Sequence, residues 1–211
     1  VMGILPFGTG NDFAKGLGLP EGDERLLDML IAFHQKRVDG AYANGRFFIN
    51  FAGFGFDTQV VINTEKYKRR YRGMLPYMLG VLEALLHLSP IKITMQKDDG
   101  EKEQMDIILL SACNGSYLGG GMHLAPLADP SDGLLDICIV TKLNRLDFLC
   151  LLPRYVKGRH LNSRHKHYFK AAPLSCESET ESALNLDGEL FSHTPAHFEV
   201  RPGALNMIVS L

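Results

Sequence analysis

The sequence lacks an excess of charge of either sign, and this limits the partners it is expected to have. Lys and Arg together number 22 and Asp and Glu number 24, so the formal net charge is −2 with His neutral. A general nucleic-acid binder needs a broad basic excess to compensate phosphates. We therefore expect no nucleic-acid partner, although the average leaves room for local basic patches.

Closely spaced cysteines and a long hydrophobic run are also missing. The four cysteines lie too far apart along the chain for a zinc knuckle or a redox motif, which predicts buried thiols in a reducing compartment. The most apolar stretch, Gly73–Leu88, contains Pro76, Glu83 and His87 and is shorter than the ~20 residues that span a bilayer. The expected location is cytoplasmic.

What is present is an ordinary globular composition, with 45% hydrophobic and 22% charged residues over 211 positions. The first 37 residues have an α/β pattern. It predicts a strand over Val1–Phe7, a glycine-rich loop over Gly8–Asp12, and helices over Phe13–Leu17 and Asp23–Gln35.

After Arg37 the pattern becomes mainly β, with short apolar segments separated by turn residues. The predicted strands are Val38–Tyr42, Arg46–Phe56, Ile91–Met95, Gln104–Asn114, Gly133–Lys142, Tyr168–Cys176, Ala183–Phe191 and Ala196–Val200. Helices are predicted over Thr58–Arg70, Met74–Leu88 and Leu146–Lys157, with Pro153 interrupting the last. The sequence thus predicts an α+β, mainly β fold: an antiparallel β-sandwich carrying helices, preceded by an α/β segment.

The loop Gly8-Thr-Gly-Asn-Asp12 lies between the first predicted strand and helix. Glycines let a backbone approach a ligand, and the N–H groups at a helix start favour phosphate. Asn11 would donate a hydrogen bond there, and Asp12 would reach a divalent metal held by the phosphate. A plain strand-to-helix turn with a capping Asn or Asp explains the same residues.

Two further motifs carry carboxylates. Asp187 and Glu189, in Leu-Asp-Gly-Glu, suit proton transfer from a hydroxyl, while a type I′ hairpin turn is the simpler interpretation of Asp-Gly. Asp129 and Asp132 follow the triple-glycine segment 119–121 and suit oxygen ligation of Mg²⁺ or Ca²⁺, with an ordinary loop as the alternative. His123, near that loop, is expected to be structural.

Two basic clusters interrupt the neutral average. Their members are Lys66, Lys68, Arg69, Arg70 and Arg72, and then Arg154, Lys157, Arg159, His160, Arg164, His165, Lys166, His167 and Lys170. Such clusters are commonly solvated faces, but they also suit an anionic membrane surface. The apolar stretch Met74–Leu88 adjoins the first cluster, so both an interfacial helix and a core helix are open interpretations.

Five segments in this order resemble the diacylglycerol kinase catalytic-domain family, most closely its soluble bacterial lipid kinases. That family is related to sphingosine and ceramide kinases and distantly to NAD kinases. The segments are Ile4–Ala14, with its Gly-Thr-Gly-Asn-Asp-Phe-Ala run, Phe48–Asp57, Gly119–Asp136, Asp187–Glu189 and Arg201–Leu205.

The resemblance implies an active site between a nucleotide-binding domain and a β-sandwich, where the ATP γ-phosphoryl group passes to a hydroxyl of diacylglycerol or a similar lipid, with Mg²⁺. It implies a nucleotide site lined by Gly8, Thr9, Gly10 and Asn11. It implies catalytic roles for Asp12 at the metal, Asp39 in the cleft, Asp187 as general base and Glu189 as its neighbour. It also implies a structural Mg²⁺ at Asp129, Asp132 and Leu134.

The family's Gly-Gly-Asp-Gly-Thr phosphate loop does not occur in this sequence, which opens on Val1. We therefore expect a truncated chain that is inactive alone. Residues 1–37 would be the C-terminal remnant of the nucleotide domain, residues 38–200 the β-sandwich domain, and residues 201–211 a C-terminal strand returning to the first domain.

Three functional hypotheses follow. The first is the C-terminal part of a lipid kinase whose partners are ATP and a lipid at the inner membrane face, with a homodimer among its possible assemblies. The second is a non-catalytic lipid- or ligand-binding regulatory module on the same fold. The third is a related kinase that acts on a non-lipid alcohol or on NAD.

Overall fold

The computed structural model describes residues 1–8, 10–98, 100–161 and 166–210. Five helices are described: α1 (Asp12–Gly16), α2 (Asp23–Ala32), α3 (Phe56–Lys68), α4 (Leu75–Leu86) and α5 (Arg145–Val156). The described strands are β1 (Gln35–Ala43), β2 (Arg46–Phe48), β3 (Phe51–Gly55), β4 (Ile91–Lys97), β5 (Lys102–Cys113), β6 (Leu135–Thr141), β7 (Lys166–Ala171), β8 (Leu174–Ser178), β9 (Ala183–Leu186), β10 (Glu189–His193) and β11 (Ala196–Ile208).

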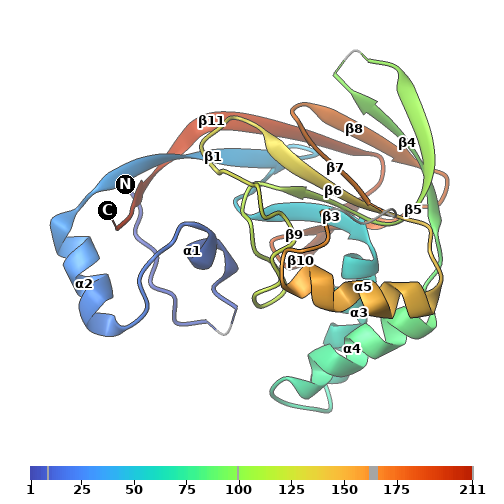
Figure 1. Ribbon diagram of the computed structural model, residues 1–211, viewed down its shortest axis with the longest axis horizontal. Helices are drawn as coiled ribbons and strands as arrows, with labels where there is room; N and C mark the ends of the chain where they lie inside the picture. Colours follow the sequence, from blue (N-terminus) through green and yellow to red (C-terminus); the bar gives the residue numbers. More distant parts are fainter. Residues whose placement is uncertain (9, 99, 162–165, 211) are drawn as a thin grey trace.

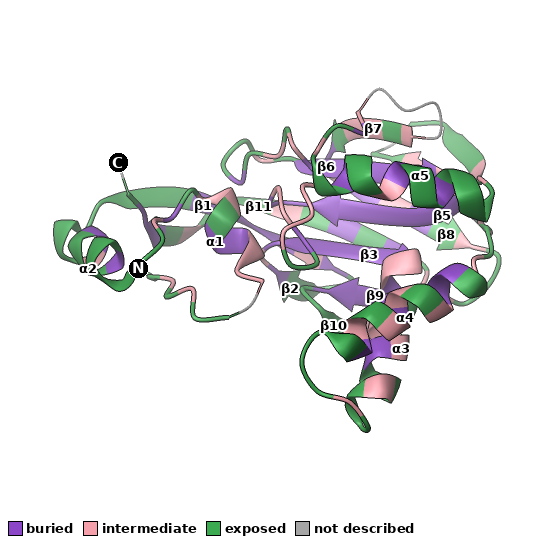
Figure 2. Ribbon diagram, turned by 60° about the horizontal axis from the view of Figure 1, so that its bottom comes forward, coloured by how far each residue is buried: buried purple, intermediate pink, exposed green. Residues whose placement is uncertain are grey.

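The strands form one curled antiparallel sheet in the order β10-β9-β3-β5-β4-β8-β11-β1-β2, with β6 added to β5 and β7 added to β6. Strand β5 turns the sheet back on itself, because its first half pairs with β4 and its second half lies between β3 and β6. The two halves of the sheet enclose the main core (Figures 1 and 2). The mainly β, sandwich-like fold expected from the sequence is therefore confirmed.

Alternation along β6 shows how the layers form. Leu135, Ile137 and Ile139 point into the core between the two halves of the sheet, whereas Cys138 and Val140 belong to a second cluster outside it. Both faces of this strand are apolar because α4 and α5 cover the outer one. Phe148 and Tyr155 of α5 and Leu85 of α4 complete this second cluster.

Helices α3 and α4 lie side by side beneath the sheet (Figure 1). Gly80 permits their close approach, since a Cβ there would lie 2.5 Å from Thr64 Oγ1 and 2.9 Å from Thr64 N. The face of α4 opposite this contact is exposed. None of the helices in the described ranges is long and apolar enough to cross a bilayer.

Helix α2 and both chain termini lie toward the far end of the paired strands β1 and β11, and α1 lies between α2 and the sandwich (Figure 1). Phe13, Leu26 and Met29 pack there against Val38 and Met207. Strand β11 runs unbroken from Ala196 through the predicted boundary at residue 201 and bonds to both ends of β1. The division of the chain into domains stays a prediction.

Several predicted elements were wrong in extent. Val1–Phe7 is not a strand. Within the described chain, Met2 alone in this segment pairs with a strand, through one bridge to Met207 near the end of β11. The helix from Asp23 ends at Ala32, where Phe33 adopts a left-handed conformation. Pro153 does not interrupt α5, which continues to Val156. Proline has no N–H to donate to the carbonyl of Leu149, four residues earlier. Leu149 is exposed to solvent, so the helix tolerates the loss of this hydrogen bond.

Three predicted strands are each two strands. Arg46–Phe56 divides into β2 and β3 at Ile49 and Asn50, whose amides bond to a side chain instead of a neighbouring strand. Tyr168–Cys176 divides before Pro173, which has no N–H for a sheet ladder. Ala183–Phe191 divides at the Asp187-Gly188 turn, where both residues have positive φ (51° and 95°). The hairpin interpretation of that motif was therefore correct for its backbone.

Candidate acceptor-binding cavity and active site

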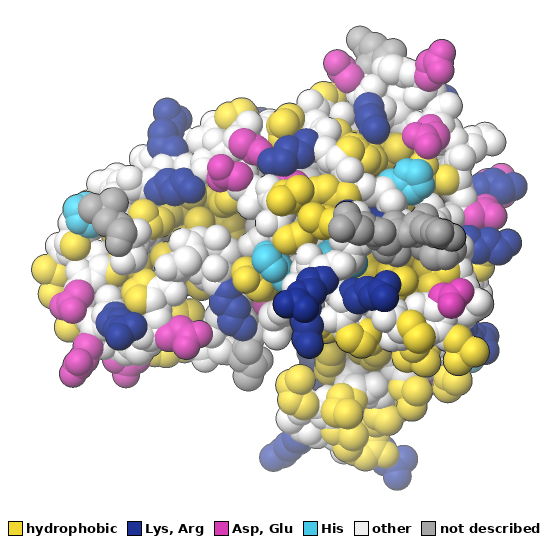
Figure 3. All heavy atoms as spheres, viewed as in Figure 1, with side chains coloured by type: hydrophobic (Ala, Val, Ile, Leu, Met, Phe, Trp, Pro, Cys, Tyr) yellow, Lys and Arg dark blue, Asp and Glu magenta, His cyan; other side chains and the backbone are white. Residues whose placement is uncertain are grey.

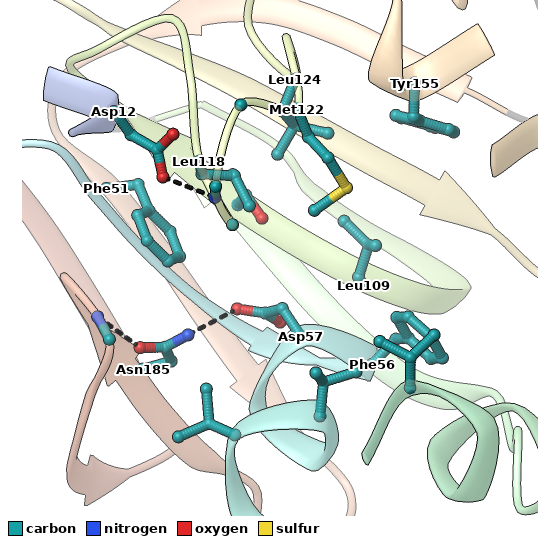
Figure 4. A pocket seen from close by; sticks show the side chains of 18 of the residues that line it. Asp12, Phe51, Phe56, Asp57, Leu109, Leu118, Met122, Leu124, Tyr155 and Asn185 are labelled. Atoms are coloured by element: carbon teal, nitrogen blue, oxygen red, sulfur yellow. Dashed lines mark hydrogen bonds between the residues drawn. The ribbon is translucent and has the colours of Figure 1, made fainter. Parts of the chain in front are cut away.

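A cavity of about 850 Å³ lies where α1 meets the sandwich, and it extends between α3, α4 and α5. Its volume is that of a small-molecule site. Most of its wall is apolar, with side chains such as Val60, Leu109, Met122, Phe148 and Leu152. The wall also carries polar side chains, among them Asp12, Asn50, Asp57, Ser111, Asn185 and Asp187. Figure 4 shows Asp12, Asp57 and Asn185 toward one side and Leu109 and Tyr155 toward the other.

Asp12, the first residue of α1, links the beginning of the chain to the sandwich. Its Oδ2 accepts a hydrogen bond from the Gly120 amide at 2.8 Å. Its Oδ1 is buried and has no hydrogen-bond partner within the described residues. Asp12 thus enters the cavity with one carboxylate oxygen positioned by the protein and the other uncommitted.

The loop ahead of Asp12 is held by its own side chain. Asn11 has a left-handed backbone (φ 53°), and its Nδ2 donates to the carbonyls of Pro6 at 2.8 Å and Gly8 at 2.7 Å. Gly10 lies close to Gly120, which lines the cavity. Thr9, the remaining predicted nucleotide-binding residue, falls outside the described residues. The nucleotide-binding roles of these four residues stay predictions.

Asp187 lies in the β9–β10 turn and borders the cavity. Its Oδ2 accepts from the amide of Ile49 at 2.7 Å, and its Oδ1 accepts from the amides of Asn50 at 3.0 Å and Phe51 at 2.9 Å. Burial raises its pKa, outweighing these three hydrogen bonds, which favour the ionised form. A carboxylate can accept about four hydrogen bonds, so the Asp187 carboxylate can accept one more from a ligand.

Asp57 is the functional candidate that sequence reasoning missed. It lies in the first turn of α3, directly after the buried strand β3, and lines the cavity. Burial raises its pKa from 3.8 to about 6, against the lowering effects of the Thr58 amide and the Asn185 side chain. Asn185 Nδ2 donates to Oδ2 at 3.3 Å, while Oδ1 makes no hydrogen bond of ordinary geometry within the described chain.

Glu189 and Asp39, both predicted to be catalytic, lie away from this cavity. Glu189 is exposed and pairs with Arg46 at 3.2 Å. Asp39 is only 2% exposed and accepts hydrogen bonds from the amides of Gly133 at 2.7 Å and Gly203 at 2.6 Å. It therefore ties the loop before β6 to the β1–β11 pair. The catalytic roles of both residues stay predictions.

The predicted structural metal loop already has internal partners. Asp129 accepts from Ser131 Oγ at 2.6 Å, and this bond is the main reason its pKa is lowered. Asp132 accepts from the Leu134 amide at 3.0 Å and pairs with Lys170. No group of three or more His, Cys, Asp or Glu able to hold a metal occurs in the described ranges. Lys36 and Lys170 pair with these two carboxylates, and the metal-binding role of Asp129, Asp132 and Leu134 stays a prediction.

Two histidines near the cavity are structural. His160 is fully buried, stacks on Tyr155 with ring centroids 4.0 Å apart, and its Nε2 lies 2.9 Å from the Leu124 carbonyl. Burial lowers its pKa to about 4, so the ring is neutral at physiological pH. His123 stacks on Tyr117 at 4.3 Å.

The chain matches two family models, which follow each other along it. Residues 50–209 match the YegS C-terminal NAD kinase beta sandwich-like domain, and residues 1–43 match the diacylglycerol kinase catalytic domain.

Relatives match almost the whole chain. It is 32% identical to the diacylglycerol kinase of Bacillus subtilis over 93% of its length, and 35% identical to the "Probable lipid kinase YegS-like" of Chromohalobacter salexigens over 97%. It spans 65% of the length of each of these relatives.

The fold is likewise similar to a crystal structure of a diacylglycerol kinase from Bacillus anthracis, with a TM-score of 0.73 and 26% identity. That match covers 99% of this chain and 66% of the other. The mainly β fold agrees with these matches. The chain belongs to the YegS-like and diacylglycerol kinase family of lipid kinases.

Proposed function

We propose that the chain forms the acceptor-binding part of a lipid kinase that uses ATP and Mg²⁺. The reaction would pass the ATP γ-phosphoryl group to a hydroxyl of diacylglycerol or a similar lipid, giving phosphatidic acid or its counterpart, at the cytoplasmic face of a membrane. One observation carries the proposal. A largely apolar cavity is lined by five residues that each hold a buried polar atom without a partner in the described chain: Asp12, Asn50, Asp57, Ser111 and Tyr155.

This arrangement suits a ligand with an apolar chain and a polar head. Uncommitted buried polar atoms are unfavourable unless a ligand or water bonds to them. An acyl chain would lie along Leu109, Met122 and Leu152, while hydroxyl and ester oxygens would reach the polar side chains of the wall. A soluble nucleotide alone would leave that apolar wall without a partner.

Asp12 is the residue here that fits a metal bound to phosphate. Its Oδ1 is buried without a partner, and its Oδ2 is fixed by the Gly120 amide. Carboxylate oxygen is the ligand type that Mg²⁺ prefers. When bound, Mg²⁺ would neutralise charge on the transferring phosphoryl group. Asp12 would then mark the phosphate side of the cavity, and Asp57 and Asp187 the acceptor side.

The acceptor oxygen would attack the γ-phosphorus as the bond from that phosphorus to the bridging oxygen of the leaving ADP breaks. The hydroxyl proton must pass to a base. Asp187 retains the proposed base role through its remaining acceptor position. Asp57 is a second candidate, because a pKa of about 6 is close to working pH and its Oδ1 is free to accept the proton.

The test of the cavity is binding of dioctanoylglycerol, a short-chain diacylglycerol, to the purified chain, followed by calorimetry. Val61→Phe, on the cavity wall, should narrow the cavity and weaken binding. Ile62→Phe is the matched control, because this next residue of α3 is 37% exposed and should leave binding unchanged. Equal binding by both variants, or none by the wild-type chain, would exclude the cavity as the acceptor site.

Phosphoryl transfer is tested with radiolabelled ATP on the full-length product of the gene. Asp12→Asn should abolish transfer while dioctanoylglycerol still binds. The same apolar cavity also favours a second function, a non-catalytic lipid-binding module. Binding without transfer by that full-length product, across diacylglycerol, monoacylglycerol and sphingosine, would support the module instead.

A further inference from the structure

The surface around the mouth of the cavity is unusually apolar. Along α4 and its N-cap, Met74, Met78, Leu82 and Leu86 recur at every fourth position and are 64%, 63%, 52% and 55% exposed. Residues at this spacing share one helical face. This stripe lies opposite the buried face of α4 that contains Gly80.

Helix α5 contributes a second row. Leu146, Leu149 and Val156 are 74%, 45% and 46% exposed. Met78 of α4 and Val156 of α5 are exposed and also line the cavity. The apolar surface is therefore continuous with the apolar wall inside, and the cavity opens between the two helices. Figure 3 shows hydrophobic side chains covering this part of the molecule.

Basic side chains border this apolar surface on two sides. Arg69, Arg70 and Arg72 lie in the connection from α3 to α4, and Arg154 and Lys157 lie at the end of α5. All five are exposed, and none forms an ion pair within the described parts of the chain. In contrast, Glu83, the acidic residue of α4, is paired with Lys66 at 2.8 Å. Lys and Arg side chains are visible at the edges of the apolar area in Figure 3.

We propose that this face, which we call the α4–α5 surface, docks on an anionic phospholipid bilayer and turns the cavity mouth toward the lipid. It consists of the exposed apolar residues of both helices and the five basic residues beside them. An apolar face with a basic border matches the interface of an anionic bilayer, where apolar side chains enter the acyl boundary and basic ones meet lipid phosphates. A lipid would then pass into the cavity along apolar surface, without crossing water.

This inference rests on the proposed function, because it gives that cavity its source of acceptor. A protein partner would bury the apolar stripe equally well. It would not by itself explain why basic residues outnumber the acidic one, Asp147 of α5, among the exposed charges of this face that form no ion pair in the described chain. The charge pattern therefore favours the anionic bilayer over a second copy of the chain.

The test is sedimentation of the chain with vesicles that contain no diacylglycerol. One set contains phosphatidylcholine and phosphatidylglycerol in equal amounts, and the other phosphatidylcholine alone. Arg69→Gln/Arg72→Gln should weaken binding to the anionic vesicles by about 25-fold, since each basic side chain near such a surface contributes about fivefold. High salt should weaken binding by at least as much, because it screens all five basic side chains.

Leu82→Gln/Leu86→Gln should weaken binding to the anionic vesicles by at least about tenfold, because two exposed leucines no longer enter the bilayer. Neither residue lines the cavity, so dioctanoylglycerol binding in vesicle-free solution should be unchanged. The controls are Leu27→Gln/Ile31→Gln and Arg25→Gln on α2, whose exposed side chains lie at the other end of the molecule. They should bind vesicles as the wild-type chain does.

Outcomes for docking and for the cavity are distinguishable. Vesicle binding without dioctanoylglycerol binding would refute the acceptor site and leave the docking surface intact. Dioctanoylglycerol binding with no preference for anionic vesicles would refute the docking surface and leave the acceptor site intact. A dimer in sedimentation velocity that Leu82→Gln/Leu86→Gln converts to monomer, with no vesicle binding, would identify the surface as an interface between copies of this chain.

Discussion

Asp57→Asn is expected to make the protein more stable than wild type at neutral pH, and this difference in stability is expected to shrink as the pH falls. The wild-type carboxyl has a pKa of about 6 in the folded chain, against an ordinary value of 3.8 for an aspartate. The folded state therefore holds the Asp57 proton over a range in which the unfolded state has released it. Asparagine keeps the shape of the side chain and removes the charge.

The sign follows from proton linkage. Below about pH 3.8 both states are protonated, and Asp57 has no pH-dependent effect. Between the two pKa values the unfolded state ionises first, so stability falls as pH rises, and the full destabilisation is present above about pH 6. One pKa unit corresponds to about 1.4 kcal/mol, so the carboxylate destabilises the folded chain by about 1 kcal/mol at pH ~4.5 and about 3 kcal/mol at pH ~7.5.

Urea unfolding of wild type and Asp57→Asn across this pH range measures the effect directly. The variant should gain about 2 kcal/mol more at the upper pH than at the lower one. Asp28→Asn, on the exposed side of α2, is the matched control and should show no such trend. A pH-independent difference, or a carboxyl that titrates at its ordinary pKa in a carbon-13 NMR titration, would refute the reasoning.

Three further predictions concern the frame around the site. Asp187→Ala should lower the free energy of unfolding by about 2–4 kcal/mol in urea titrations, because three backbone amides lose their acceptor; an unchanged midpoint would contradict this. Gly80→Val should lower the free energy of unfolding by at least about 1–3 kcal/mol, because its side chain would meet Thr64 at the α3–α4 contact; an unchanged urea midpoint would refute this close contact. In acceptor titrations, each CH₂ added to the acyl chains should improve binding by up to ~0.8 kcal/mol until the cavity is full; affinity independent of chain length would exclude an apolar acyl site.

Local patterns were enough for much of the fold. Helix α1, the Asp187-Gly188 turn and the alternating strands each follow from short-range sequence signals, and they appear where those signals place them. Val1–Phe7 has the same kind of apolar signal and is not a strand, because pairing depends on which strands are adjacent in space. Local residue preferences do not contain that information.

The candidate site divides in the same way. Asp12 and Asp187 were found because each lies in a distinctive short motif. Asp57 was missed because its unusual property arises from distant parts of the chain. Asn185, which donates to it, lies 128 positions away in sequence, and its burial depends on how α3 packs beneath the sheet. In the sequence alone, Asp57 directly precedes a predicted helix, where a carboxylate is favourable for ordinary reasons.

The triple-glycine loop explains how two separate parts of the chain form one site. Gly119, Gly120 and Gly121 all have positive φ, at 65°, 87° and 112°, which side-chain-bearing residues rarely adopt. This conformation turns the Gly120 amide toward Asp12, and Asp12 thereby joins a cavity whose other carboxylates come from the sandwich. An alanine at 120 would meet no steric obstacle from neighbours, yet it would strain the backbone that aims this donor. The loop's glycines are thus best explained by the placement of Asp12, whether or not their amides also meet phosphate.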